Sequence, residues 1–130
     1  MIVDSSAVVA LLNDEPDAEV LLAAIRAADA PQMSVANFLE CALVVDGYGR
    51  AELSEDLEPL LDRLRITLAP VTVEQAHVAR AAHRRYGRGS GSPARLNFGD
   101  CFAYALAKDT GEPLLYKGDD FRHTDVRSAL

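Results

Sequence analysis

The sequence has few cysteines and no long apolar run, and both absences restrict the class of protein. Its two cysteines, Cys41 and Cys101, are far apart and form no C-x-x-C motif. We therefore expect reduced, buried thiols in a cytoplasmic protein rather than a zinc site. There is no run of about eighteen apolar residues, so no segment is expected to span a membrane. The first apolar stretch is interrupted by Asp4 and has no basic residue before it, which argues against a signal peptide.

An excess of positive charge is also lacking. The formal net charge is -7 at pH 7, which argues against a simple basic nucleic-acid binder. The charge is uneven, however, because the segment from residue 80 to residue 95 is rich in arginine. Its arginines are Arg80, Arg84, Arg85, Arg88 and Arg95. This segment is therefore a candidate for contact with an anionic partner.

Length and pattern indicate one domain, residues 1–130, of the α/β class. With 49% hydrophobic and 25% charged residues, a chain of 130 residues can bury a proper core. Short apolar stretches alternate with helical periodicity, which predicts a short, mostly parallel β-sheet flanked by α-helices. We expect strands at 1–4, 32–35, 66–71 and 114–116. We expect helices at 7–13, 17–29, 37–48, 53–65, 73–86 and 98–108, with a flexible loop at 87–93.

Carboxylates stand at positions where a sheet of this kind gathers its functional groups. Asp4 ends the first predicted strand, and Asp119 and Asp120 follow the last one. Glu40 and Asp100 lie within strongly apolar helical segments. Because sites in open α/β sheets form at the carboxyl ends of the strands, we expect several of these acids to lie together.

Each acid also has an ordinary structural explanation. Asp4 is a good helix N-cap. Glu40 and Asp100 each follow an asparagine by three residues, the spacing of a capping box. Gly-Asp-Asp is a common turn composition. The set as a whole favours a site, because clustered carboxylates raise one another's pKa unless a cation joins them. Oxygen ligands favour Mg²⁺ or Mn²⁺, and an acidic site holding such ions suits phosphodiester hydrolysis.

Three sequence runs, together with the Glu40 helix, resemble a known family. They are MIVDSSA at residues 1–7, NFGDCFAYALA at 97–107 and KGDDF at 117–121. In order and spacing they are similar to a PIN domain, and more narrowly to a VapC-type ribonuclease toxin of a toxin–antitoxin pair, over essentially the whole chain. The resemblance implies a PIN fold and a Mg²⁺-dependent endoribonuclease, for which Mn²⁺ could substitute. It also implies a VapB-type antitoxin as partner, a homodimer and a cytoplasmic location.

The resemblance implies roles for individual residues. Asp4, Glu40 and Asp100 are expected to hold the metal, and Ser6 to orient a ligand or water. A fourth acid is expected at Asp120, because the Asp-Phe pair matches the motif, although Asp119 remains open.

The arginine-rich segment fits an RNA-binding role. Arg84, Arg85, Arg88 and Arg95 are expected to bind RNA phosphates, which would make binding sensitive to salt. Alternatively, they are only an exposed helix end, where arginine is electrostatically favoured.

Two other functions fit parts of the pattern. The chain could be a catalytically inactive, PIN-like protein-binding module whose acids only cap helices. A phosphotransfer domain is a weaker interpretation, because the first strand is not followed by an Asp-x-Asp pair and no lysine is obviously placed for a phosphoryl group.

Overall fold

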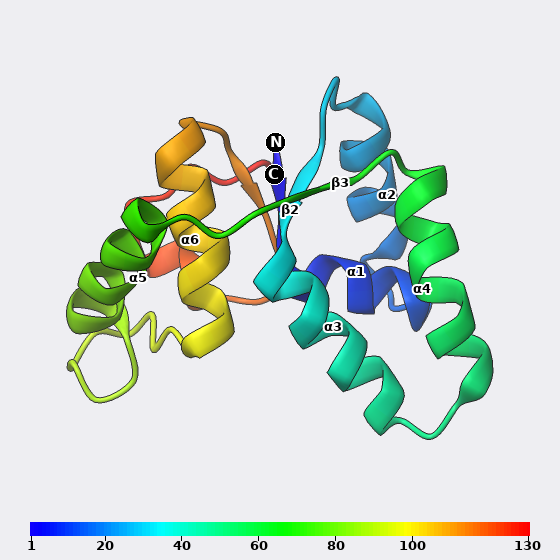
Figure 1. The fold of residues 1–130 in the computed structure, drawn as a ribbon, viewed down its shortest axis with the longest axis horizontal. Helices are drawn as coiled ribbons and strands as arrows, with labels where there is room; N and C mark the ends of the chain where they lie inside the picture. Colours follow the sequence, from blue (N-terminus) through cyan, green and yellow to red (C-terminus); the bar gives the residue numbers. More distant parts are fainter.

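The protein is built around a four-stranded parallel sheet. The computed structural model describes all 130 residues and places the strands in the order β3-β2-β1-β4 (Figure 1). Ile2 pairs with Gln32 on one side and with Leu114 on the other. All neighbouring strands run parallel, as expected when helical crossovers connect them. The strands are β1 (Ile2–Val3), β2 (Gln32–Ser34), β3 (Thr67–Ala69) and β4 (Leu114–Leu115).

Six α-helices cover the two faces of this sheet. In Figure 1, α5 and α6 lie on one side and α1 to α4 on the other, with both termini near the sheet. The helices are α1 (Ser5–Leu12), α2 (Ala18–Ala27), α3 (Val35–Gly47), α4 (Ala51–Arg63), α5 (Val73–Tyr86) and α6 (Phe98–Thr110). A short 3₁₀ turn, η1 (Asp120–His123), follows β4. The predicted α/β fold class, with a short parallel sheet flanked by α-helices, is confirmed.

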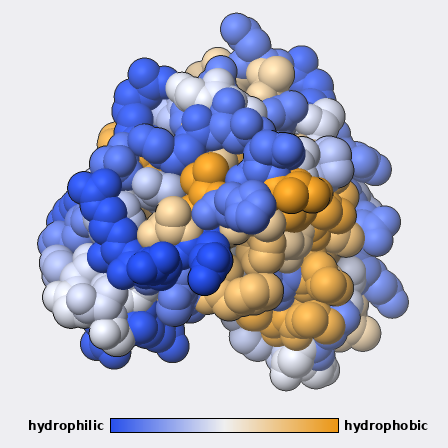
Figure 2. Space-filling view, turned by 60° about the vertical axis from the view of Figure 1, so that its left-hand side comes forward, coloured by the Kyte–Doolittle hydropathy of each residue, from blue (hydrophilic) through white to orange (hydrophobic).

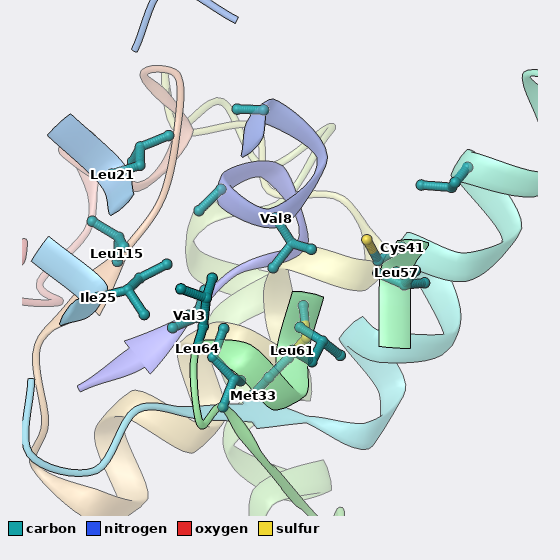
Figure 3. Close-up of a cluster of buried hydrophobic side chains, with 14 of the residues drawn as sticks. Val3, Val8, Leu21, Ile25, Met33, Cys41, Leu57, Leu61, Leu64 and Leu115 are labelled. Carbon is teal, nitrogen blue, oxygen red and sulfur yellow. The ribbon is translucent and has the colours of Figure 1, made fainter. Parts of the chain in front are cut away.

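The two central strands divide the core into two clusters. Val3 and Leu115 pack with α1, α2, α3 and α4, whereas Ile2 and Leu114 pack with α5 and α6. This follows from the alternation of side chains along a strand. Figure 3 shows the first cluster, with Leu21 and Ile25 of α2 close to Leu115. Both strands are therefore buried on both faces, which fixes the position of the residues that follow them.

Three helices begin earlier than the sequence suggests: α4 starts at Ala51 rather than at residue 53, and α1 and α3 start directly after a strand. Helix α1 was expected to start at residue 7 and α3 at residue 37, but they start at Ser5 and Val35. In each case the residue at the end of the preceding strand is the cap. Asp4 accepts a hydrogen bond from the amide of Ser6, and Ser34 accepts one from the amide of Ala36. Both helices therefore begin directly at the carboxyl edge of the sheet.

The two cysteines lie in the core. Cys41 and Cys101 are buried and unpaired, as predicted. Burial is the main cause that raises the pKa of the Cys41 thiol to about 12 and that of Cys101 to about 11. No helix is long and apolar enough to cross a membrane.

Candidate active site

Asp4 is a buried carboxylate in which one oxygen accepts hydrogen bonds and the other accepts none. It lies at the end of β1 and is 2% exposed. Its Oδ2 accepts hydrogen bonds from the Ser6 amide at 2.9 Å and from the Ser6 hydroxyl at 2.6 Å. Its Oδ1 is buried and has no hydrogen-bond partner. Burial raises the pKa of Asp4, partly offset by the bonds from Ser6. An unpaired buried acceptor of this kind is costly, and a bound cation would relieve it.

Asp100 combines a cap with an unusual protonation equilibrium. It forms the predicted capping box of α6, in which the Asn97 amide donates to Asp100 Oδ2 at 2.7 Å and the Asp100 amide donates to Asn97 Oδ1 at 2.9 Å. Burial, together with the smaller effect of the charges of Asp4, Asp120 and Glu40, nevertheless raises the pKa of Asp100 to about 7, against the lowering effect of the Asn97 hydrogen bond. The side chain therefore sits among other acids, although they are distant in sequence.

Glu40 is held by partners from two helices. Its Oε2 accepts a hydrogen bond from the Ser5 hydroxyl at 2.8 Å and one from Asn37 Nδ2 at 3.2 Å. The predicted Asn37–Glu40 capping box is wrong, because α3 begins at Val35 and Asn37 already lies inside the helix. Asn37 Nδ2 also donates to the Gly99 carbonyl at 2.9 Å, which ties α3 to α6. Sequence reasoning missed the bond from Ser5 to Glu40 and the bond from Asn37 to Gly99, since both join different helices.

Gly99 lets the Glu40 carboxylate approach α6. A Cβ added at Gly99 would overlap the carboxylate atoms of Glu40. Gly99 has no positive φ, so its value lies in the space that it leaves rather than in backbone freedom. The only sequence signal was the glycine immediately before Asp100. The close approach explains how acids on α3 and α6 come to share one site.

One cleft at the carboxyl edge of the sheet collects the predicted residues. Its volume is about 280 Å³, which is room for a hydrated ion and a phosphate group, since liquid water occupies ~30 Å³ per molecule. The structure places Asp120 on this cleft but not Asp119, which is 72% exposed and paired with Arg122 at 3.3 Å. The polar side chains lining it include Asp4, Ser6, Glu40, Asp100, Lys117 and Asp120.

The residues of the cleft fit a divalent cation, although they are not closed around one. No group of three His, Cys, Asp or Glu side chains is close enough to hold an ion in this arrangement. The candidate ligands are all carboxylate oxygens, which Mg²⁺ and Mn²⁺ prefer. The unpaired Oδ1 of Asp4 and the raised pKa of Asp100 both mark a deficit of positive charge. Asp120 is exposed and has the most freedom to adjust, whereas Glu40 is half-buried and held by Ser5 and Asn37.

Ser6 connects Asp4 to the end of β4. Its hydroxyl donates to Asp4 Oδ2 and accepts a hydrogen bond from the Lys117 amide at 3.0 Å. In the structure, Ser6 therefore orients the Asp4 carboxylate. The predicted role toward a ligand or water would have to act through this carboxylate. Lys117 was not singled out from the sequence, and its place on the cleft depends on the pairing of β1 with β4.

The predicted RNA-binding arginines lie outside the acidic cleft and in different settings. Arg84 lines a groove of about 530 Å³ between α5 and α6, together with Phe98. Arg85 stacks over Tyr86, with 4.8 Å from its guanidinium carbon to the ring centroid, and lies 3.9 Å from Asp125. The remaining two, Arg88 and Arg95, are exposed in the segment that leads to α6.

An apolar surface separates the arginines from the acids. Phe98 is 79% exposed and lies on both the α5–α6 groove and a second groove between α3 and α6. That second groove also includes Leu39, Leu43 and Glu40, so it reaches the acidic cleft. Figure 2 brings the α5–α6 side of the molecule forward and shows an apolar area bordered by hydrophilic side chains.

Replacing Gly99 by alanine should separate function from stability. We expect Gly99→Ala to displace the Glu40 carboxylate and to lower Mn²⁺ affinity by about 10- to 100-fold, the usual effect of disturbing groups that orient metal ligands. The free energy of unfolding should change by less than about 1 kcal/mol, because the higher helix propensity of alanine offsets the cost of displacing the Glu40 side chain. Titration calorimetry and urea unfolding measure the two effects. Gly47→Ala is the control, since its Cβ would meet nothing within 4 Å. Equal metal affinity in both variants would contradict this role of Gly99.

Metal-free protein should lose stability as pH rises through the range in which Asp100 titrates. The folded state holds this proton up to a pKa of about 7, whereas 3.8 is the ordinary value in an unfolded chain. Between these values the folded state binds more protons, so the free energy of unfolding falls with increasing pH. Thermal unfolding in EDTA from pH 4 to pH 8 should show a steeper decline for wild type than for Asp100→Asn. Parallel pH profiles would contradict the raised pKa.

Comparison with known proteins identifies the family. Residues 1–127 match the model of the PIN domain family. Ribonuclease VapC28 of Mycobacterium tuberculosis is 50% identical over 130 residues, covering 100% of this chain and 98% of the relative. Ribonuclease VapC42 of the same species is 49% identical over 129 residues, covering 99% and 98%.

Solved structures agree on the fold. The crystal structure of Mycobacterium tuberculosis VapC20, described as a sarcin-ricin loop cleaving toxin, matches with a TM-score of 0.78 at 13% identity, covering 96% of this chain and 95% of the other. A toxin–antitoxin complex from Klebsiella pneumoniae gives 0.72 at 15% identity, covering 95% and 92%. At these identities the structures speak for the fold alone, whereas the sequence relatives define the group. The chain belongs to the PIN-domain family and, within it, to the VapC proteins.

Proposed function

We propose that this protein is a Mg²⁺-dependent endoribonuclease toxin of a toxin–antitoxin module. The observation that carries the proposal is the cleft in which Asp4, with its unpaired buried oxygen, faces the same space as Glu40, Asp100 and Asp120. The choice of RNA as substrate is supported by the names of the relatives, which are ribonucleases.

The acids of the cleft would act as metal ligands. Asp4 and Asp100 would hold Mg²⁺, or Mn²⁺ in its place, with Glu40 and Asp120 completing the site. When bound, the cation lowers the pKa of water and offsets the charge that develops on the phosphate oxygens. Ser6 keeps the Asp4 carboxylate in place, while Ser5 and Asn37 hold that of Glu40. Hydrolysis by water does not need the 2′-hydroxyl and leaves a 5′-phosphate and a 3′-hydroxyl.

The partners follow from the family and from the surface. A VapB-type antitoxin as inhibitor is supported by the VapC relatives and by a structural neighbour described as a toxin–antitoxin complex. A homodimer is supported by the exposed apolar side chains of Leu39, Leu43 and Phe98, because such a patch usually marks an interface. A cytoplasmic location is supported by the two unpaired thiols.

Cleavage of pooled total RNA tests the proposal. Wild type, free of antitoxin, should cut with Mg²⁺ and not with EDTA. Asp100→Asn and Asp120→Asn should each lower the rate by about 100-fold or more, because the bound ion contributes several kcal/mol to the transition state. Asp119→Asn is the matched control and should keep the wild-type rate, since Asp119 points away from the cleft toward Arg122. No cutting by wild type would favour the inactive binding module, and cutting that survives EDTA would reveal a contaminant.

The arginine-rich segment should contribute affinity rather than chemistry. Replacing Arg84 and Arg88 together by alanine should weaken RNA binding and reduce the slope of log K against log salt by about 1.4, the value for two phosphate contacts on a single strand. The control replaces the exposed Arg26 of α2 and Arg63 of α4, which changes the net charge equally. Equal losses in the two double variants would mean that only net charge matters.

A further inference from the structure

We propose that Lys117 binds a non-bridging oxygen of the RNA phosphate at the site of cleavage. The inference deepens the proposed ribonuclease function, on which it rests. It assigns to the acidic cleft a basic residue of its own, in addition to the arginines on the outer surface.

The position of Lys117 is fixed close to the acids. The residue follows β4 directly, and its backbone amide donates to Ser6 Oγ at 3.0 Å. Ser6 Oγ in turn donates to Asp4 Oδ2 at 2.6 Å. Two hydrogen bonds therefore connect the Lys117 backbone to the most buried carboxylate of the site, and any phosphate that meets Asp4 comes within reach of a lysine side chain starting at this point.

Lys117 is also the only basic residue that lines the cleft. The acids that share it, Asp4, Glu40, Asp100 and Asp120, repel a phosphodiester. The arginines do not compensate for this inside the cleft, because Arg80 and Arg84 line the groove between α5 and α6 instead. A lysine at this position supplies the missing attraction for the substrate.

The ammonium group is available for such a contact. Its Nζ is paired with Glu15 and lies 3.6 Å from Asp17, both in the turn between α1 and α2. The pKa of Lys117 is raised, chiefly by the hydrogen bond to Glu15, so the group is charged at neutral pH. Lys117 and Glu15 are each 32% exposed and Asp17 is 60% exposed. A partly exposed pair contributes little, and the flexible stem of lysine allows the group to turn from Glu15 to a phosphate.

The test compares two variants that lose the same ion pair. Lys117→Met removes the cation, whereas Glu15→Gln removes its nearer partner, keeps the cation and leaves only the longer contact with Asp17. Each is made in the Asp100→Asn background, so that RNA is bound without being cut. The probe is a fluorescein-labelled single-stranded RNA oligonucleotide, and anisotropy gives its affinity with Mg²⁺ at several salt concentrations.

Lys117→Met should weaken binding by about 10- to 100-fold, the size of one charge-assisted hydrogen bond, and reduce the salt slope by about 0.7. Glu15→Gln should bind as tightly as the parent or more tightly, with an unchanged slope. Lys117→Arg should keep the slope. Thermal unfolding should shift by similar amounts for Lys117→Met and Glu15→Gln, because both lose the Lys117–Glu15 pair and the contact with the exposed Asp17 is longer.

The outcomes separate this inference from the proposed function. Equal weakening by Lys117→Met and Glu15→Gln would show that the ion pair is only structural and would overturn the inference. An unchanged affinity and slope in Lys117→Met would do the same. If wild type does not cut RNA but Lys117→Met still lowers affinity and slope, the nuclease function fails and the phosphate contact stands. If the same substitution in otherwise wild-type protein also lowers cleavage while Glu15→Gln does not, both hold.

Discussion

The buried carboxylate of Asp4 determines the electrostatics of the cleft at the carboxyl edge of the sheet. β1 is only two residues long and buried on both faces, so the side chain that follows it is almost fully buried and reaches solvent only at the wall of the cleft. One oxygen caps α1 through Ser6, and the other has no partner. Burying an unpaired carboxylate costs several kcal/mol. The fold therefore carries a local electrostatic deficit at the carboxyl edge of its sheet, which a cation would remove.

Capping and metal binding are compatible in this protein, because a carboxylate has two oxygens. Asp4 and Asp100 each use Oδ2 for the start of a helix, and Glu40 uses Oε2 for contacts to Ser5 and Asn37. At Asp4 and Asp100, the hydrogen bonds that begin the helices also fix the orientation of the carboxylates, whereas the bonds of Glu40 connect it to α1 and to its own helix. A structural role of Asp4 and Asp100 is therefore compatible with the proposed metal-binding role, since the capping bonds also hold the two carboxylates in place.

The sequence was sufficient for the fold class and for the order of the elements, because short apolar strands alternate with long amphipathic helices. It also indicated the acids that share the cleft, from their positions after strands and in apolar helices. It could not show that α3 begins at Val35, because the cap depends on where β2 ends. Nor could it show that Glu40 is held by Ser5 of another helix, or that Asp120 rather than Asp119 faces the cleft. These features depend on contacts between distant segments, which local patterns do not encode.

Calorimetric titration with Mn²⁺ shows whether the cleft binds a divalent cation through Asp4, as we propose. We predict that wild type binds Mn²⁺ near neutral pH and releases protons as it does so, because the pKa of Asp100 is about 7 before the ion is bound. Asp4→Asn should lose this binding while remaining folded. A metal site formed by Asp4 would be ruled out if wild type bound no Mn²⁺, or if Asp4→Asn bound it with the same affinity.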